Sequence, residues 1–319
     1  MTKTVLKTFA AITFLVMVIL SLMIFVPSHE EIKTVRITRQ TSLRQISEKL
    51  AQKELLRSPF LFIVITKISG HERNLKAGLY EIPANGSPYQ VFQKLASGKT
   101  AVVRITVPEG WSSREIAKLL ERKDLCSRES FLTVVAQKSL EGFLFPNTYF
   151  IPSELSPEAI TRIFVKEFKN IWKPEWSERA KQIRFTQKEI LTLASIIERE
   201  TTLDEEKPII SSVFHHRLRR GMRLEADPTV LYAIQSWRIP LTSRLLHTVS
   251  PYNTYLHRGL PPGPICNPGM KSIMAALYPA KTNYLFFVAD GNGTHIFSQT
   301  LAEHNSARNM VKAQKNRSI

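Results

Sequence analysis

The pattern of apolar and polar positions divides the chain into an apolar N-terminal run, a series of short strands and helices, and a longer remainder rich in helix signals. The run Thr8–Val26 is 19 residues without a charge, close to the roughly 20 that a helix needs to cross a bilayer. A cleaved signal peptide is the alternative, but its apolar region is usually about 7 to 15 residues long and ends at small residues. Residues 26–29, Val-Pro-Ser-His, match such a site poorly, so we predict an uncleaved membrane anchor at residues 8–26.

Charges on either side of this anchor predict its orientation. Lys3 and Lys7 precede the apolar run, whereas Glu30 and Glu31 follow it. Because positive charge favours the cytoplasmic side, residues 1–7 are predicted to be a cytoplasmic tail and the rest of the chain to lie outside the cytoplasm. Nucleic acid and ATP are not expected there as partners.

One pattern recurs three times between residues 35 and 125: a short alternating strand, a polar turn, and a helix with apolar residues at helical spacing. The strands are Val35–Thr38, Gly78–Ile82 and Val103–Thr106, and the helix caps follow at Ser42, Ser87 and Ser112. Such units are common packing modules, so their apolar positions are expected to form a core rather than a binding site.

A strongly apolar helix is predicted after the capping box at Thr186–Glu189. At 100° per residue, Glu198 lies almost directly above Leu191 on the apolar stripe, whereas Glu200 points roughly the opposite way. Burial raises the pKa of a carboxylate unless a cation compensates, and the protonated form is the one that a general acid needs. Glu198 is therefore a candidate acid.

A structural reading of Glu198 stands beside the catalytic one. The residue could lie in a frayed last turn, facing solvent or paired with Arg199 or Arg217. Glu200 has the same ambiguity with fewer apolar neighbours. Spacing by itself does not choose between these readings.

Polar residues further along the chain supply further candidates. Asp227 precedes Pro228 in the manner of a helix cap, a role at least as consistent with the pattern as catalysis. His295 follows a predicted hairpin turn at residues 290–293, and His304 lies in the helix after it. No third ligand stands at recognisable spacing, so we expect structural histidines and no metal site.

Two segments rich in turn residues complete the candidates. Residues 250–255, which include Tyr252 and Asn253, and residues 259–264 combine hydroxyl, amide and aromatic groups that suit a sugar ring. A rigid surface loop is the competing interpretation, because proline and glycine account for most of the pattern.

The composition and charge of the chain limit the classes of partner that it is expected to bind. Of 319 residues, 43% are hydrophobic and 22% charged, as in globular proteins, and the net charge of +17 favours an anionic partner such as nucleic acid, anionic lipid or an acidic wall polymer. The basic residues are scattered, so no nucleic-acid-binding arm is indicated. Cys126 and Cys266 are the only cysteines, which excludes a disulfide framework and leaves open whether they pair.

Several motifs in series resemble the endolytic murein transglycosylase (YceG-like) family, and residues 35–98 resemble a LysM-type module, whose family binds aminosugar polymers. The motifs are Leu193–Thr201, Ala226–Thr229, Ser250–Tyr255, Gly259–Pro264 and His304-Asn305. The resemblance covers essentially the whole chain and implies an α+β fold: the anchor, a LysM-like module at residues 31–106 and a mixed helical and strand catalytic domain at residues 107–319. One departure is Asn147, where the family usually carries aspartate.

The resemblance also implies an activity. Glu198 falls at the family's catalytic glutamate, which implies a cofactor-free lyase that cleaves the bond between N-acetylmuramic acid and N-acetylglucosamine and leaves 1,6-anhydromuramyl ends. Its implied setting is the bacterial cell membrane, near penicillin-binding proteins or other glycan polymerases whose nascent strands it would terminate. Residues proposed to position substrate are Glu200, Asp227, Tyr252, Asn253, His295 and His304. The alternatives are a hydrolytic muramidase, with Asp227 as second carboxylate, and a non-catalytic wall-binding protein.

Overall fold

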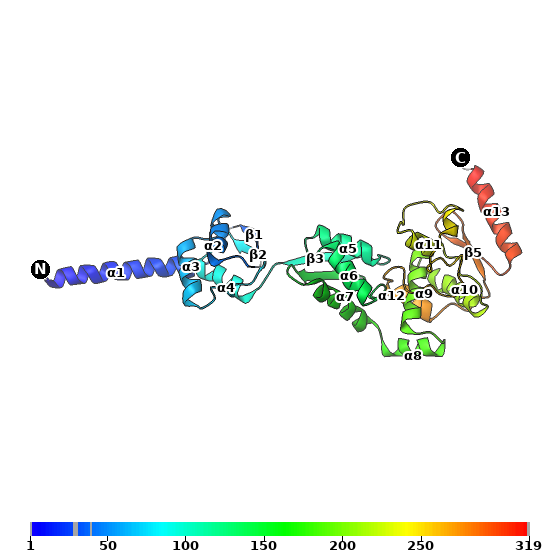
Figure 1. Cartoon of the computed structure of the whole chain (residues 1–319), viewed down its shortest axis with the longest axis horizontal. Helices are drawn as coiled ribbons and strands as arrows, with labels where there is room; N and C mark the ends of the chain where they lie inside the picture. Colours follow the sequence, from blue (N-terminus) through cyan, green and yellow to red (C-terminus); the bar gives the residue numbers. More distant parts are fainter. Residues whose placement is uncertain (1, 28–30, 39, 318–319) are drawn as a thin grey trace. The chain divides into compact units, whose positions relative to one another are not determined.

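The computed structural model describes residues 2–27, 31–38 and 40–317, and it divides into two compact units. Unit 1 comprises residues 1–104 and 150–155, and unit 2 comprises residues 105–149 and 156–319. Residues 28–30 lie outside the described residues. They include Ser28 and His29, from the segment that matches a cleavage site poorly, and Glu30, one of the charges used to predict the orientation of the anchor. Figure 1 shows a mixture of helices and short strands, the latter in two-stranded sheets.

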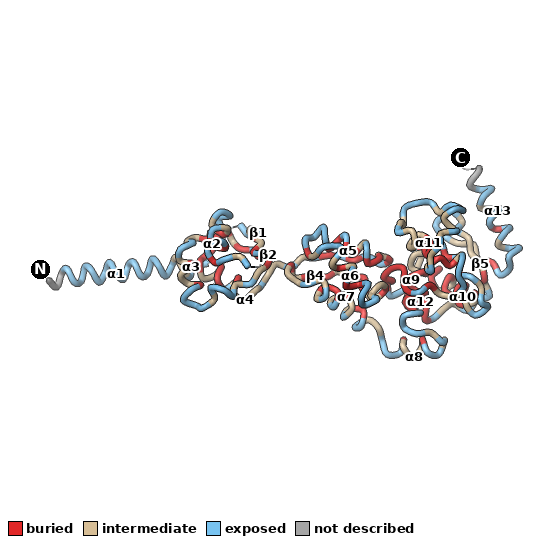
Figure 2. The backbone as a smooth tube through the Cα atoms, viewed as in Figure 1, coloured by how far each residue is buried: buried red, intermediate tan, exposed pale blue. Residues whose placement is uncertain are grey.

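Helix α1 (Thr2–Phe25) contains the predicted anchor. Its segment Val5–Phe25 is 21 residues long and apolar enough to cross a membrane, and none of it is buried by the rest of the chain. Figure 2 shows this helix exposed over most of its length, and only Met23 and Ile24 near its end are partly buried. An apolar helix that no protein core covers is consistent with a single-pass membrane protein.

Unit 1 contains the first two predicted strand-helix units. Strand β1 (Ile32–Ile37) pairs antiparallel with β2 (Gly78–Pro83), with Val35 opposite Tyr80. Helices α2 (Leu43–Gln52) and α4 (Pro88–Ser97) begin after the predicted caps Ser42 and Ser87. The buried faces of these elements form one core, as the alternation in the strands and the helical spacing predicted.

The pattern analysis missed one helix of unit 1, α3 (Pro59–Ile68). Its sequence is apolar almost throughout and therefore lacks the polar face that marks an amphipathic helix. It packs against α2 and α4 through buried residues such as Phe62. The LysM-like identity of this region stays a prediction.

The division between the units falls within strands β3 (Val102–Val107) and β4 (Asn147–Pro152), which pair with each other. The first helices of unit 2 are α5 (Ser113–Arg122), α6 (Arg128–Gln137), α7 (Pro157–Ile171) and α8 (Pro174–Gln182). A capping box of Ser112 and Glu115 begins α5, as predicted. The boundaries of the functional domains, 31–106 and 107–319, stay predictions.

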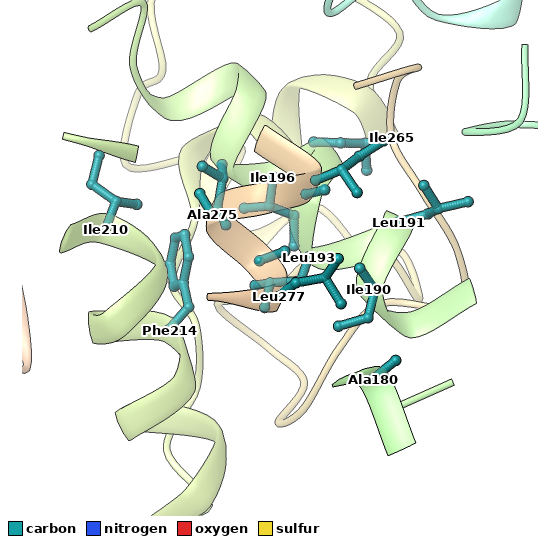
Figure 3. Close-up of a cluster of buried hydrophobic side chains, with 14 of the residues drawn as sticks. Ala180, Ile190, Leu191, Leu193, Ile196, Ile210, Phe214, Ile265, Ala275 and Leu277 are labelled. Atoms are coloured by element: carbon teal, nitrogen blue, oxygen red, sulfur yellow. The ribbon is translucent and has the colours of Figure 1, made fainter. Parts of the chain in front are cut away.

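The core of unit 2 is built around α9 (Gln187–Glu200). Helices α10 (Lys207–Arg219), α11 (Asp227–Ala233) and α12 (Met270–Leu277) all contact it. Figure 3 shows α9 residues such as Leu193 and Ile196 beside Ala275 and Leu277 of α12. Six apolar residues of α9 are completely buried, which confirms that this helix is covered on nearly all sides: Ile190, Leu191, Leu193, Ala194, Ile196 and Ile197.

The C-terminal part contains the predicted hairpin, β5 (Phe286–Ala289) and β6 (His295–Ser298), followed by α13 (Leu301–Arg317). The short 3₁₀ turn η1 (Leu245–His247) precedes the loop at residues 250–255. Cys126 and Cys266 are both free thiols.

Candidate active site

Glu198 lies in the last turn of α9, on the face that the helix buries. The capping box at Thr186 and Glu189 fixes where the helix begins, and the apolar run that follows fixes which face turns inward. As a result the Glu198 side chain is only 9% exposed. The solvent-facing, frayed alternative is wrong for this residue.

Two hydrogen-bond donors hold one carboxylate oxygen of Glu198. The backbone N–H of Gly269 donates to Oε2 at 3.0 Å, and the Ser272 hydroxyl donates to the same oxygen at 2.6 Å. Both donors belong to the N-terminal end of α12, where backbone N–H groups favour negative charge. Oε2 therefore has its hydrogen-bond partners within the protein, and Oε1 is the oxygen left for another proton.

The cation beside Glu198 is Lys207, not Arg199 or Arg217. Lys207 Nζ lies 3.6 Å from Glu198 Oε1 and 3.2 Å from Asp204 Oδ1, and its side chain is 4% exposed. A buried ammonium needs such partners because desolvation otherwise costs several kcal/mol. Lys207 is thus the compensating cation that the sequence argument had left open, and burial is not by itself a reason for Glu198 to be protonated.

The two arginines considered as partners have other contacts. The Arg199 guanidinium stacks 3.8 Å over the Trp237 ring and donates to the Gly110 carbonyl oxygen. Arg217 is buried and donates to backbone carbonyl oxygens, including those of Leu285 and Leu224. Neither forms an ion pair with Glu198 among the described residues.

A second carboxylate near Glu198, Glu109, was missed by the sequence analysis. Gly110 has a φ of +77°, and a Cβ added there would lie 3.5 Å from Glu198 Cγ, so this turn passes directly beside Glu198. Partial burial and the charge of Glu198 raise the pKa of the exposed Glu109 side chain. The available signal was an acidic residue and a glycine between a strand and a capped helix.

Glu200 lies in a different environment from Glu198. Burial, with a contribution from the charge of Asp227, raises the pKa of Glu200 to about 8, while Arg217 opposes the rise. The Tyr255 hydroxyl donates to Asp227 Oδ1. The structure thus brings Glu200 and Asp227 together, as electrostatic neighbours of each other.

This burial makes a prediction about pH. The pKa of Glu200 is about 4.5 in the unfolded chain and about 8 in the folded one, so the folded state holds this proton more tightly. The resulting stabilisation is complete below pH 4.5 and is lost as the pH rises through about 8. In wild type the free energy of unfolding should therefore fall between pH 5 and pH 8, and in Glu200→Gln this fall should be smaller by on the order of 2 kcal/mol. Chemical unfolding of the full chain across this range measures it.

The matched control is Glu205→Gln, the same substitution at an exposed carboxylate a few residues away. It should leave the pH dependence unchanged. Equal slopes for wild type and Glu200→Gln would contradict the assignment of the slope to Glu200.

Asp227 is the first residue of α11, not its cap. The N-cap is Ala226, and it makes no side-chain capping bond because alanine has none to offer. The capping interpretation of Asp227 was therefore wrong by one position. As an acidic residue in the first turn, Asp227 still favours the helix through its dipole.

Tyr252 and Asn253 are neighbours in the chain with different surroundings. The half-buried Tyr252 ring lies 4.8 Å from that of Tyr232, and burial and the charge of Glu141 raise its pKa. Asn253 is completely buried, and its amide donates to the carbonyl oxygens of Leu246 and Thr248. Asn253 holds the loop and has no exposed surface, so of these two residues only Tyr252 is accessible to a ligand.

The two candidate histidines have structural contacts. His295 Nδ1 lies 2.6 Å from Glu206 Oε2, and the backbone N–H of His295 donates to Oε1 of the same carboxylate. The His304 ring stacks on Phe286 at 5.3 Å, and burial lowers its pKa. Within the described part of the chain, no group of three or more His, Cys, Asp or Glu residues could hold a metal ion.

Asn147, the departure from the family pattern, begins strand β4. Its amide donates to Glu167 at 2.9 Å, and its side-chain oxygen accepts from the Thr148 N–H. These contacts involve neither Glu198 nor its donors.

Comparison with known proteins agrees with the motifs. A model of the YceG-like family matches residues 35–310. The endolytic murein transglycosylase of Bacillus subtilis (strain 168) is 33% identical over 91% of this chain and 88% of its own length. That of Streptococcus pneumoniae serotype 2 (strain D39) is 27% identical over 85% of this chain, which spans 58% of that longer relative.

A solved structure is similar as well. The crystal structure of a YceG-like protein from Listeria monocytogenes is 34% identical, with a TM-score of 0.57. The match covers 87% of this chain and 99% of the other.

Proposed function

Because the chain belongs to the YceG-like family, whose named relatives are endolytic murein transglycosylases, we propose that it cleaves the bond between N-acetylmuramic acid and N-acetylglucosamine and leaves 1,6-anhydromuramyl ends. It is a lytic transglycosylase, a lyase that acts on peptidoglycan. The observation that carries the finer proposal is the environment of Glu198: two donors on Oε2 and a buried ammonium beside Oε1.

Glu198 acts first as a general acid. Since Gly269 and Ser272 both donate to Oε2, the transferable proton resides on Oε1. It passes to the glycosidic oxygen while an oxocarbenium-like centre develops on the muramyl ring. The ammonium of Lys207 and the two donors then stabilise the carboxylate that remains.

The same carboxylate acts next as a base. It accepts the proton of the muramyl 6-hydroxyl while that oxygen attacks C1, which closes the 1,6-anhydro ring. The nucleophile is part of the substrate and already held close, so no second carboxylate is needed to activate water. No cofactor takes part in this sequence.

A hydrolytic muramidase is the second candidate, because Glu109 lies beside Glu198. A hydrolase of this type uses a second carboxylate to activate water or to form a covalent intermediate. Asp227, the earlier candidate for that role, neighbours Glu200 rather than Glu198. The non-catalytic wall-binding alternative is dropped, since the named relatives are enzymes.

The remaining parts are proposed to position the enzyme and its substrate. Glu200, Asp227 and Tyr252 act on substrate only through placement, whereas His295 and His304 support the fold around them. The LysM-like module holds the glycan. Helix α1 anchors the chain in the cell membrane, with the catalytic unit outside the cytoplasm, or in the periplasm where an outer membrane exists. Near nascent strands, with penicillin-binding proteins or other polymerases as partners, the enzyme would end glycan polymerisation.

Product chemistry tests the proposal. Full-length protein in detergent is incubated with purified peptidoglycan, and the released glycans are analysed by mass spectrometry. Internal fragments that end in 1,6-anhydromuramic acid are expected. Reducing ends in their place would establish the hydrolase, and intact strands would contradict both.

A further inference from the structure

A large groove in unit 2 has no role in the chemistry described so far. It measures about 970 Å³, and its lining includes the aromatic side chains Trp111, Tyr232 and Trp237. Trp111 follows Gly110, whose backbone passes beside Glu198. At the other wall, Arg199, the residue after Glu198, stacks on Trp237. The groove therefore starts next to the catalytic acid.

Cations are the second feature of this groove, which we call the basic groove. Three of them stand one helical turn apart along α5, so they share one face of that helix. The five cations, all exposed, are Arg114, Lys118, Arg122, Arg128 and Arg238. The ion pairs of the described residues all involve other cations, so these five have no carboxylate within ion-pair distance.

The two carboxylates of the groove accept hydrogen bonds from uncharged donors and pair with none of its cations. Glu115 accepts from the backbone N–H and the hydroxyl of Ser112 at the start of α5. Glu121 accepts from the backbone N–H of Arg128 at 3.1 Å. The groove thus keeps a net positive charge, which attracts anionic groups.

The chemistry of the polymer identifies the anion. N-acetylated sugars are uncharged, and the muramic acid carboxyl is consumed as the amide that joins the peptide. The negative charge of a strand therefore sits on its peptide stems, whose free ends and acidic residues are carboxylates. Aromatic walls and guanidinium groups together suit such a short, carboxylate-bearing peptide.

We propose that the basic groove binds the peptide stem next to the scissile bond, so that the enzyme selects strands with free stems over peptide-free strands. This inference rests on the proposed function, because it places a stem beside the bond that Glu198 cleaves. A stem whose terminal carboxyl is consumed in a crosslink lacks that carboxylate and fits the groove less well.

The test compares kcat/KM on two matched substrates: peptide-bearing glycan strands, and the same strands after an amidase has removed the stems. Wild type should prefer the peptide-bearing strands. In the full-length double variant Lys118→Gln/Arg122→Gln, the ratio of the two values should fall about tenfold, since two charge-assisted contacts are lost. Raising the salt concentration should reduce the wild-type ratio as well.

The matched control is Lys166→Gln/Lys169→Gln, which removes two exposed positive charges from α7 outside the groove. Its ratio should equal that of wild type. An unchanged ratio in the groove variant would overturn the proposal. A parallel loss on both substrates would overturn it too, because the groove would then hold the sugar backbone.

Binding separates this inference from the proposed function. The full-length Glu198→Gln variant, titrated with peptide-bearing and peptide-free oligosaccharides, should bind the peptide-bearing ones more tightly, and the groove substitutions should remove that preference. If wild type yields no anhydro ends but the binding preference holds, the proposed reaction fails and the stem site stands. Equal binding of both oligosaccharides would refute the stem site whatever the product chemistry.

Discussion

Glu198→Gln is expected to lower the rate of glycan cleavage by about 10³-fold or more while the chain still folds and binds glycan. The amide cannot donate a proton as an acid or accept one as a base. It does keep an oxygen for the Gly269 N–H and the Ser272 hydroxyl, and Lys207 keeps Asp204 as its ion-pair partner. Anhydro ends released per unit time, with circular dichroism as the check on folding, measure the effect.

Two further glutamate variants sharpen this test. Glu205→Gln makes the same chemical change at an exposed side chain close by and should retain full activity. Glu109→Gln separates the mechanisms: a hydrolase that needs two carboxylates should lose as much activity as with Glu198→Gln, whereas a transglycosylase should lose far less. Retention of most activity in Glu198→Gln would refute its assignment as the acid.

The second large effect concerns stability. Arg217→Met is expected to lower the free energy of unfolding of unit 2 by about 3–5 kcal/mol, or its Tm by about 10 °C. Methionine fills a similar volume, but it leaves the carbonyl oxygens of Leu285 and Leu224 without the donors they now have at 2.8 and 2.9 Å. It also removes the positive charge that opposes the raised pKa of Glu200.

Arg219→Met is the matched control, because Arg219 lies near the end of the same helix and is exposed. Its effect on Tm should be within about 1 to 2 °C, as for most surface substitutions. A loss of less than about 1 kcal/mol for Arg217→Met would show that water replaces the guanidinium contacts.

Local patterns predicted most individual elements correctly. The caps Ser42, Ser87 and Ser112, the strands that precede their helices, and the hairpin at residues 286–298 were all confirmed. Helices α6, α7 and α8 and strand β4 were not predicted, and two further misses have a physical reason. Helix α3 lacks a polar face, and α12 is only 8 residues long, too short for a helical period to stand out.

The candidate residues were predicted less completely than the elements. Helical geometry correctly separated Glu198 from Glu200 by their faces. It could not predict that donors surround the former while Asp227 lies near the latter. Asn253 was chosen for its polarity, which in the structure serves the loop's own carbonyl groups.

The sequence by itself determined the apolar anchor segment, the family, the position of α9 and the helix face on which Glu198 lies, because each follows from local composition, periodicity or an ordered set of motifs. The burial of Glu198 was left open by the sequence and was decided by the structure. Only the tertiary structure decided what touches that carboxylate. Gly269 and Ser272 follow it by 71 and 74 positions, and Glu109 precedes it by a similar span. Contacts across such separations depend on how helices pack, and packing leaves no periodic signal in a single sequence.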